Sequence, residues 1–152
     1  MRYYPIYLDI RDKPCVVIGG GDVAERKVLS LLNAGAKVTV ISPEVTDILK
    51  GISRGGRIEI KERPYKEGDL KSAFMAYAAT DNEDINYKIS EEANKSGVLL
   101  NVVDEPEMCD FILPSVVERG LLSIAISTGG ASPAFAKRLR LEMEERYAEE
   151  YA

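Results

Sequence analysis

Short apolar runs alternate, along most of the chain, with stretches in which apolar residues recur at every third or fourth position. The short runs indicate buried strands, and the wider spacing indicates one face of a helix. Strands are expected at Cys15–Gly19, Lys37–Ser42, Arg57–Lys61, Ala73–Ala79 and Val98–Val103. The regular alternation of strand and helix predicts a Rossmann-like α/β fold with a doubly wound parallel sheet.

Three helices are expected between these runs, over Val23–Ala34, Glu44–Ile52 and Asn82–Ser96. Gly35 follows the first and Gly97 the third, and glycine accepts the left-handed conformation in which helices often end. Thr80 and Asp81 precede the third helix, so their side-chain oxygens are candidates to cap its first turn.

The pattern changes in the last third of the chain. Two β-rich runs, Phe111–Val117 and Leu121–Ser127, predict a hairpin. The final segment predicts a helix with Ser132 as its cap and Pro133 at its first position, where the missing N–H costs nothing. A stripe at four-residue spacing on this helix suits either the core or a subunit interface: Phe135, Leu139, Met143 and Tyr147.

The composition is that of an ordinary folded protein, with 45% hydrophobic and 30% charged residues among 152. The net charge of −5 argues against nonspecific binding to nucleic acid or to an anionic membrane, because both require a positive field. The absence of histidine excludes a His-ligated metal site, and the two cysteines form no Cys-x-x-Cys pair. No apolar stretch is long enough for a signal peptide or a membrane span, so we expect a cytoplasmic protein.

A glycine-rich segment, Gly19–Ala24, connects the first predicted strand to the first helix. It matches the Gly-x-Gly-x-x-Ala form of the dinucleotide fingerprint. Gly19 allows the tight turn, Gly21 lets the backbone approach a diphosphate, and Ala24 lets helix and strand pack closely. The unpaired amides at the helix N-terminus attract the anion. The segment therefore predicts a bound dinucleotide.

The end of the second predicted strand lacks the acidic residue that usually binds the ribose. Pro43 and Glu44 follow that strand and are the candidates to meet the ribose instead. No arginine stands there to hold a 2′-phosphate, which favours NAD over NADP. Thr80, after the fourth strand, lies at the same expected edge of the sheet and is either a cofactor contact or a helix cap.

Asp104 ends the fifth predicted strand in the sequence Asn101-Val102-Val103-Asp104. The carboxyl ends of parallel strands form the ligand edge of such a sheet. Hydride transfer to a nicotinamide needs a group that takes the accompanying proton, and a carboxylate at this edge suits that role. From position alone, a structural role as a cap for the following turn is equally consistent.

Six blocks together carry a more specific resemblance: Pro5-Ile6, Gly19–Lys27, Ala78–Asp81, Asn101–Asp104, Phe111–Ser115 and Ser127–Pro133. In these blocks the chain resembles the precorrin-2 dehydrogenases, a family that includes the N-terminal part of bacterial sirohaem synthase. The blocks span nearly the whole chain, and their joint occurrence is far more specific than the glycine loop alone.

The resemblance implies NAD-dependent oxidation of precorrin-2 to sirohydrochlorin in sirohaem biosynthesis, with Asp104 as the catalytic residue. It implies NAD contacts from Asp22, Val23, Pro43 and Glu44. It also implies that three residues border the tetrapyrrole: Asn101, Asp104 and Thr128. The many carboxylates of that substrate need local cations, for which Arg119, Lys137, Arg138 and Arg140 are candidates, although an ordinary solvated helix face explains each of them too.

Family members are homodimers that use the segment after Pro114, so we expect an NAD-binding domain over residues 1–110 and a dimerisation segment over residues 111–152. Members of the family continue into a further helical region, whereas this sequence stops at Tyr151-Ala152. The resemblance therefore covers the dehydrogenase part and leaves ferrochelatase activity open.

Two alternatives remain at this stage. An NAD-sensing regulatory domain without catalysis explains the glycine loop equally well, but it gives no purpose to the Asn101–Asp104 and Ser127–Pro133 blocks. A family member that dimerises and binds cofactor without turnover is the other alternative.

Overall fold

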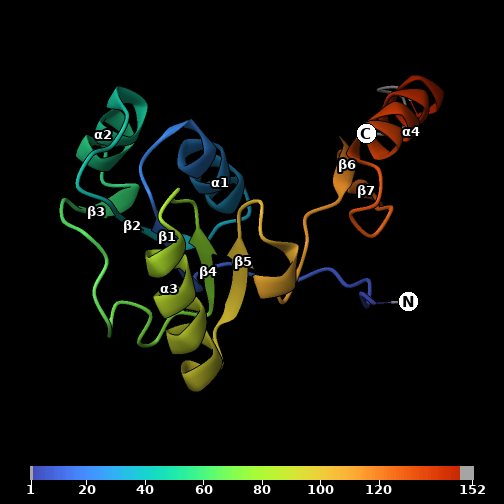
Figure 1. Ribbon diagram of the computed structural model, residues 1–152. Coiled ribbons are helices and arrows are strands. Elements are labelled where there is room, and N and C mark those ends of the chain that lie inside the picture. The colour runs from blue at the N-terminus through green and yellow to red at the C-terminus, as the bar shows by residue number, and fades with distance from the viewer. Residues whose placement is uncertain (1, 148–152) are drawn as a thin grey trace. The chain divides into compact units, whose positions relative to one another are not determined.

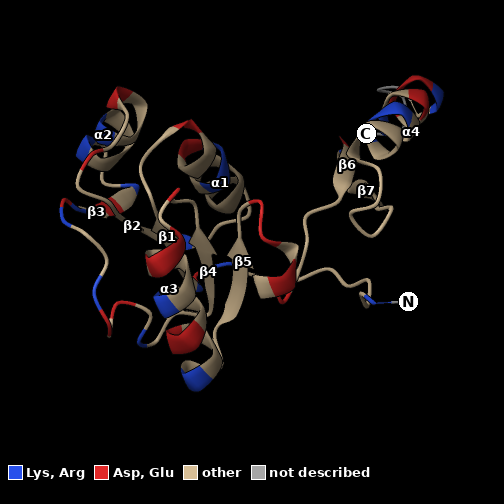
Figure 2. Cartoon of the chain, viewed as in Figure 1, with Lys and Arg blue, Asp and Glu red and all other residues tan. Residues whose placement is uncertain are grey.

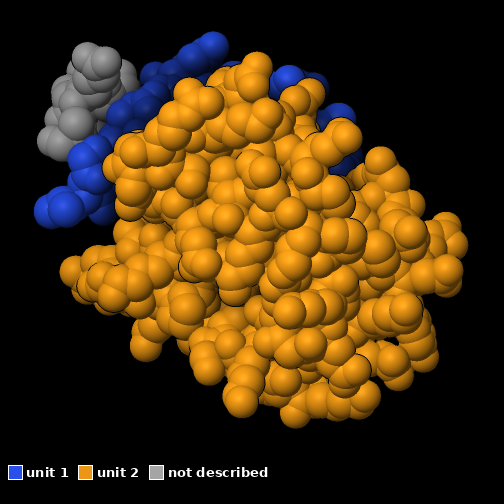
Figure 3. Space-filling view, turned by 90° about the vertical axis from the view of Figure 1, so that its left-hand side faces the viewer, with its two compact units in different colours: residues 1–5, 111–152 blue, residues 6–110 orange. Residues whose placement is uncertain are grey.

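The structure, a computed structural model, describes residues 2–147. The chain divides into two compact units, coloured separately in Figure 3. One unit comprises Ile6–Asp110, and the other comprises Phe111–Ala152 together with Met1–Pro5.

The unit of residues 6–110 is built around a five-stranded sheet in which all neighbouring strands run parallel (Figure 1). The strand order is β3-β2-β1-β4-β5. The strands are β1 (Pro14–Ile18), β2 (Lys37–Ile41), β3 (Ile58–Lys61), β4 (Met75–Ala78) and β5 (Leu99–Val102). This architecture confirms the predicted Rossmann-like sheet.

Helices α1 (Asp22–Asn33) and α3 (Glu83–Ser96) cover opposite faces of this sheet (Figure 1). Val16 and Ile18 of β1 pack in one cluster with Ile89 of α3. Val17, between them, is fully buried on the α1 side. Burial on both faces explains why the strands read as continuous apolar runs rather than as alternating ones.

All three helices of this unit start at a different residue from the one expected, α1 by a single residue. Helix α2 (Asp47–Arg54) begins three residues later than the expected start at Glu44. The reason is its cap, because the Thr46 side chain accepts a hydrogen bond from the Leu49 N–H at 3.2 Å. Helix α3 is capped by Asn82, whose Oδ1 accepts from the Ile85 N–H at 3.0 Å, so the expectation of a Thr80 or Asp81 cap was wrong.

The unit containing residues 111–147 consists of an antiparallel hairpin, β6 (Ser115–Arg119) and β7 (Leu122–Ile126), and helix α4 (Pro133–Arg146). The Ser132 side chain accepts from the Phe135 N–H at 3.3 Å, which confirms the predicted cap. The first strand starts at Ser115 rather than at Phe111, directly after Pro114, which has no N–H for a ladder.

Helix α4 is held on the hairpin by few buried groups. Val117 and Ala136 are the only buried residues among residues 111–147. The Arg119 guanidinium donates to the carbonyl oxygen of Tyr147 at 3.0 Å and to that of Glu144 at 3.4 Å. Phe135, the first residue of the predicted stripe, is exposed. The predicted stripe is therefore not fully buried within residues 111–147.

Within residues 2–147, none of the helices has both the length and the apolar character that a membrane crossing requires.

Candidate functional site

The loops that follow β1, β2 and β4 meet at the carboxyl edge of the sheet, where the strand order reverses between β1 and β4. The Gly19 N–H donates to the Ile41 carbonyl at 2.9 Å, and the Ala79 N–H donates to the Ile18 carbonyl at 2.7 Å. The Thr46 N–H donates to the Gly20 carbonyl at 3.0 Å. Crevices at such reversal points are where open α/β sheets bind ligands.

The three consecutive glycines of this edge are required for different reasons. Gly19 has φ +117°, and a Cβ there would lie 2.2 Å from the Ala79 carbonyl oxygen. A Cβ on Gly20 would lie 2.0 Å from the Glu44 carbonyl oxygen. A Cβ on Gly21 would have no neighbour within 4 Å among the described residues, and Gly21 has an ordinary φ of −83°. Packing thus demands the first two glycines, whereas the third leaves open space beside the backbone.

That open space lies at the N-terminus of α1. The first bond of the helix runs from the Glu25 N–H to the Gly21 carbonyl at 2.9 Å. The amides of Asp22, Val23 and Ala24 come before this bond, so the helix offers them no carbonyl partner. These amides and the helix dipole suit a diphosphate, and the missing side chain of Gly21 lets it come close. The residues present therefore fit a dinucleotide.

The loop after β2 is also held by side-chain hydrogen bonds, one to helix α1 and one within the loop. The Thr46 hydroxyl donates to the Glu25 carboxylate at 2.6 Å, and the Ser42 hydroxyl donates to the Glu44 carbonyl at 2.6 Å. These bonds fix the backbone on which Pro43 and Glu44 lie. The second loop is thus held in a defined conformation next to the first.

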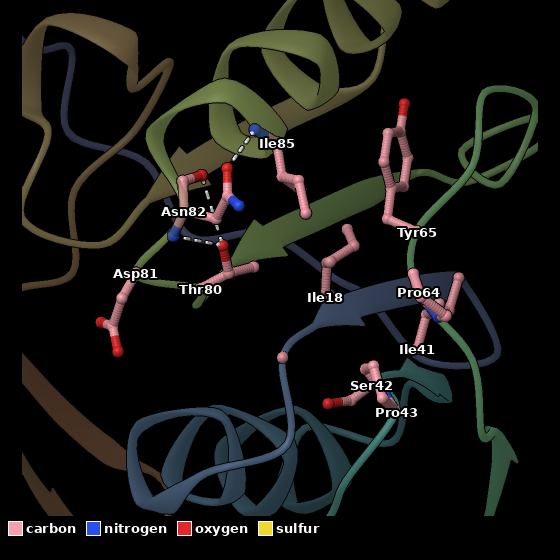
Figure 4. A pocket seen from close by; sticks show the side chains of 11 residues that line it. Ile18, Ile41, Ser42, Pro43, Pro64, Tyr65, Thr80, Asp81, Asn82 and Ile85 are labelled. Carbon is pink, nitrogen blue, oxygen red and sulfur yellow. Dashed lines mark hydrogen bonds between the residues drawn. The ribbon is translucent and has the colours of Figure 1, made fainter.

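A pocket of about 510 Å³ opens at this edge. Figure 4 shows Thr80, Asn82 and Ile85 on one side, Ser42 and Pro43 on the other, and Ile18 between them. Its lining is Ile18, Gly19, Ile41, Ser42, Pro43, Pro64, Tyr65, Thr80, Asp81, Asn82 and Ile85. A largely apolar lining with a few polar groups is typical of sites for flat heterocyclic ligands.

Three of the predicted cofactor contacts, Gly19, Pro43 and Thr80, line this pocket. The Thr80 hydroxyl accepts from the Asn82 N–H at 3.1 Å, and the Thr80 carbonyl accepts from the Asn86 side-chain amide at 3.0 Å. The remaining predicted contacts lie beside the pocket, in the glycine segment or in the loop after β2: Gly21, Asp22, Val23, Ala24 and Glu44.

Sequence reasoning missed several lining residues, notably Pro64, Tyr65 and Asn82. Pro64 and Tyr65 belong to the long connection between β3 and β4, and no local motif marks them. The neighbouring Arg63 is bound to Asp69 by two hydrogen bonds of 2.7 Å, which lower the pKa of the Asp69 carboxyl. This guanidinium is therefore committed to a carboxylate of the protein.

Asp104 lies at the same carboxyl edge of the sheet, beyond the end of β5. The Val103 N–H donates to the Ala78 carbonyl at 2.9 Å and joins this segment to the end of β4. Asp104 is exposed and has φ +62°, in the left-handed region that most residues avoid. Asn101 lies within β5, where it pairs with Tyr77.

Thr128 lies in the unit of residues 111–147, where its hydroxyl accepts from the Ser132 N–H at 3.0 Å. On α4, Arg138 pairs with Glu142 at 3.0 Å, and Arg140 pairs with Glu144. Figure 2 shows charges of both signs along this helix. Among residues 2–147, no group of three or more Cys, Asp or Glu side chains is arranged to hold a metal ion.

Comparison with known proteins gives two matches to family models. Residues 6–115 match a family described as "Putative NAD(P)-binding", and residues 119–146 match one described as "Sirohaem biosynthesis protein central".

The chain is similar to curated sirohaem synthases. It is 44% identical over 144 residues to that of Nitrosococcus oceani, covering 95% of this chain and 31% of the relative. It is 40% identical to that of Escherichia coli, of which it covers 32%. The chain thus spans less than a third of the length of these relatives.

Among solved structures, the chain is similar to SirC, a precorrin-2 dehydrogenase, with a TM-score of 0.87 and 31% identity. The match covers 98% of this chain and 73% of SirC. The D-lactate dehydrogenase of Escherichia coli matches with a TM-score of 0.51 and 13% identity, a likeness of fold alone.

Proposed function

Because the chain belongs to the precorrin-2 dehydrogenase family, we propose that it oxidises precorrin-2 to sirohydrochlorin with NAD, a step of sirohaem biosynthesis. The observation that carries this proposal is the geometry of the carboxyl edge. Gly21 leaves open space beside the amides at the N-terminus of α1, which have no partner within the helix. The exposed carboxylate of Asp104 lies at the same edge of the sheet.

Bound NAD would supply a hydride acceptor. The amides of Asp22, Val23 and Ala24 would hold its diphosphate, with Gly21 leaving the necessary room. The pocket next to Gly19, Pro43 and Thr80 would enclose the adenosine half. The carboxylate of Glu44, beside that pocket, would meet the ribose.

Two hydrogens leave the substrate in this reaction. One would leave as a hydride, with both electrons of a C–H bond, for which bound NAD would supply the acceptor. The other would leave as a proton, and we assign its uptake to the Asp104 carboxylate, with Asn101 bordering the tetrapyrrole. Since Asp104 is exposed, it can pass the proton on to solvent water and return to its charged form.

The same geometry supports NAD over NADP. A 2′-phosphate needs a nearby cation, and the residues that directly follow β2, Ser42, Pro43 and Glu44, include none, although Lys61 of β3 pairs with Ile41 at the end of β2. Arg63, adjacent to the pocket lining, is already bound to Asp69.

The test is to incubate the protein with precorrin-2 and NAD while recording NADH formation and the sirohydrochlorin spectrum. Stoichiometric appearance of both supports the dehydrogenase. NAD binding without turnover would instead support the two alternatives without catalysis, the regulatory domain and the inactive family member. No NAD binding would remove all of these functions. NADP in place of NAD should give a much lower kcat/KM.

The proposal includes a homodimer formed through residues 111–152 and a cytoplasmic location, where NAD is available. Large apolar side chains of the hairpin unit are exposed: Leu113, Val116, Leu121, Phe135 and Leu141. Because only Val117 and Ala136 are buried among residues 111–147, this apolar surface needs a cover, and a second copy of the chain is the natural one. Subcellular fractionation tests the location.

A further inference from the structure

Lys27 is a partly buried cation on α1 that packs against the sheet. Its Nζ lies 5.6 Å from the centroid of the Tyr77 ring in β4, a cation–π contact. Tyr77 itself is only 3% exposed. The contact therefore holds the ammonium at a defined place on the α1 face, rather than letting it move freely in solvent.

That place is close to Asp104. Tyr77 pairs with Asn101 in β5, so both residues face the α1 side of the sheet, and Asp104 follows the same strand. Lys27 and Asp104 attract each other electrostatically. The cation thus lies on the α1 face of the sheet and attracts the carboxylate to which we assign the proton transfer.

The charge of Lys27 is not compensated by a close partner. None of the ion pairs within 4 Å among residues 2–147 includes it. Burial, followed by repulsion from Arg26, lowers the pKa of Lys27, while Asp104 and Cys109 act in the opposite direction. Burial of an ammonium costs free energy that the attraction of the ring offsets only in part, and a bound anion offsets more of it.

The surroundings show why an anionic ligand needs this cation. The segment after β5 carries Asp104, Glu105 and Glu107, and Figure 2 shows it in the colour of acidic residues. A polycarboxylate approaching Asp104 would be repelled by this segment. Lys27 is a positive charge placed to offset that repulsion.

We propose that Lys27 binds a carboxylate side chain of the tetrapyrrole and thereby positions the ring beside Asp104. This inference rests on the proposed dehydrogenase function and adds a specificity-determining residue to it. Lys27 acts on the substrate and not on the dinucleotide.

The test compares Lys27→Met with Lys27→Arg and with a matched control, Lys13→Met. Lys13 also lies 5.6 Å from an aromatic ring, that of Phe74, but it is exposed and precedes β1 at the opposite edge of the sheet. We expect Lys27→Met to raise the KM for precorrin-2 by about tenfold or more, because a charged hydrogen bond is lost. Lys27→Arg should restore most of the loss, and Lys13→Met should match the parent protein.

Three further readouts separate ligand binding from a structural role. The Kd for NAD and the Tm of Lys27→Met should match those of the parent. The KM of the parent should rise with ionic strength more steeply than that of Lys27→Met. The kcat/KM of the parent should fall at alkaline pH as Lys27 loses its proton, starting below the ordinary lysine value of 10.5, and Lys27→Arg should remove this fall.

The Kd for sirohydrochlorin, the polycarboxylate product, compares the same variants without requiring turnover. Weaker binding of this product to Lys27→Met supports the inference even if the parent proves inactive, which would overturn only the proposed reaction. Equal KM and equal product Kd in parent and Lys27→Met would overturn the role of Lys27. So would a selective loss of NAD affinity, which would assign Lys27 to the cofactor.

Discussion

At the scale of single residues, the glycine segment separates packing from binding. Gly19 is confined by its positive φ and by the Ala79 carbonyl, whereas Gly21 has an ordinary φ and open space beside it. In the sequence, both glycines are simply positions of the dinucleotide fingerprint. Only their neighbours in the structure show that one is needed for packing and the other leaves room for a ligand.

Gly19→Ala and Gly21→Ala should therefore fail in different ways. Gly19→Ala should lower the free energy of unfolding by about 2 kcal/mol or more, because the methyl group meets backbone and the φ is strained. Gly21→Ala should leave stability within about 0.5 kcal/mol but weaken NAD binding about tenfold or more. Denaturant unfolding and calorimetric titration with NAD measure the two effects, and equal NAD affinity in Gly21→Ala would contradict the assignment of the diphosphate.

Asp104 is tested by Asp104→Asn and Asp104→Ala. Asparagine tolerates the left-handed φ of this position, so Asp104→Asn removes the charge and keeps the backbone. Both variants should keep NAD affinity and lose turnover by roughly 10²- to 10⁴-fold. Unchanged kcat in Asp104→Asn would exclude this carboxylate from the proton transfer.

At the scale of elements, the caps decide where helices begin. The sequence offered Thr80 and Asp81 as caps of α3 and placed Asn82 within the helix, but it is Asn82 that makes the bond to the first turn. Thr80 instead accepts from the Asn82 N–H and shapes the loop that lines the pocket. A choice among neighbouring cap residues depends on the direction in which the loop enters the helix, which the sheet determines.

Asn82→Ala should lower the free energy of unfolding by about 1 kcal/mol, because the Ile85 N–H loses its acceptor. Asp81→Ala is the matched control and should change stability by less than about 0.5 kcal/mol, since Asp81 is exposed and makes no cap bond. Thermal and denaturant unfolding measure both, and an equal loss in the two variants would contradict the cap assignment.

At the scale of the whole molecule, the two units differ in how much they bury. Residues 6–110 enclose a core on both faces of the sheet, whereas Val117 and Ala136 are the only buried residues among residues 111–147. This difference is the physical basis for assigning the hairpin unit to contact with a second copy of the chain.

Phe135→Glu should convert the proposed dimer to a monomer, because it places a charge in the apolar surface of α4. Phe135 is 53% exposed. Ile48→Glu is the matched control, since Ile48 is 56% exposed but lies on α2 of the other unit. Light scattering after gel filtration should give a monomer mass for the first variant and an unchanged mass for the second. A monomeric parent protein would refute the dimer itself.

The sequence by itself determined the features that depend on near neighbours in the chain. The alternation of apolar runs and helical spacing predicted the parallel sheet, and Ser132 with Pro133 predicted the start of α4, because periodicity and capping are local. The glycine segment, which is also local, predicted the cofactor. The resemblance of six sequence blocks to the family implied the reaction class.

Only the tertiary structure decided which distant residues meet. The strand order β3-β2-β1-β4-β5 joins the loops after β1, β2 and β4, brings Tyr65 to their pocket, and places the Lys27 ammonium against the Tyr77 ring, where it attracts Asp104. No local pattern encodes these contacts, because the hydrogen bonds and packing that create them join residues far apart along the chain.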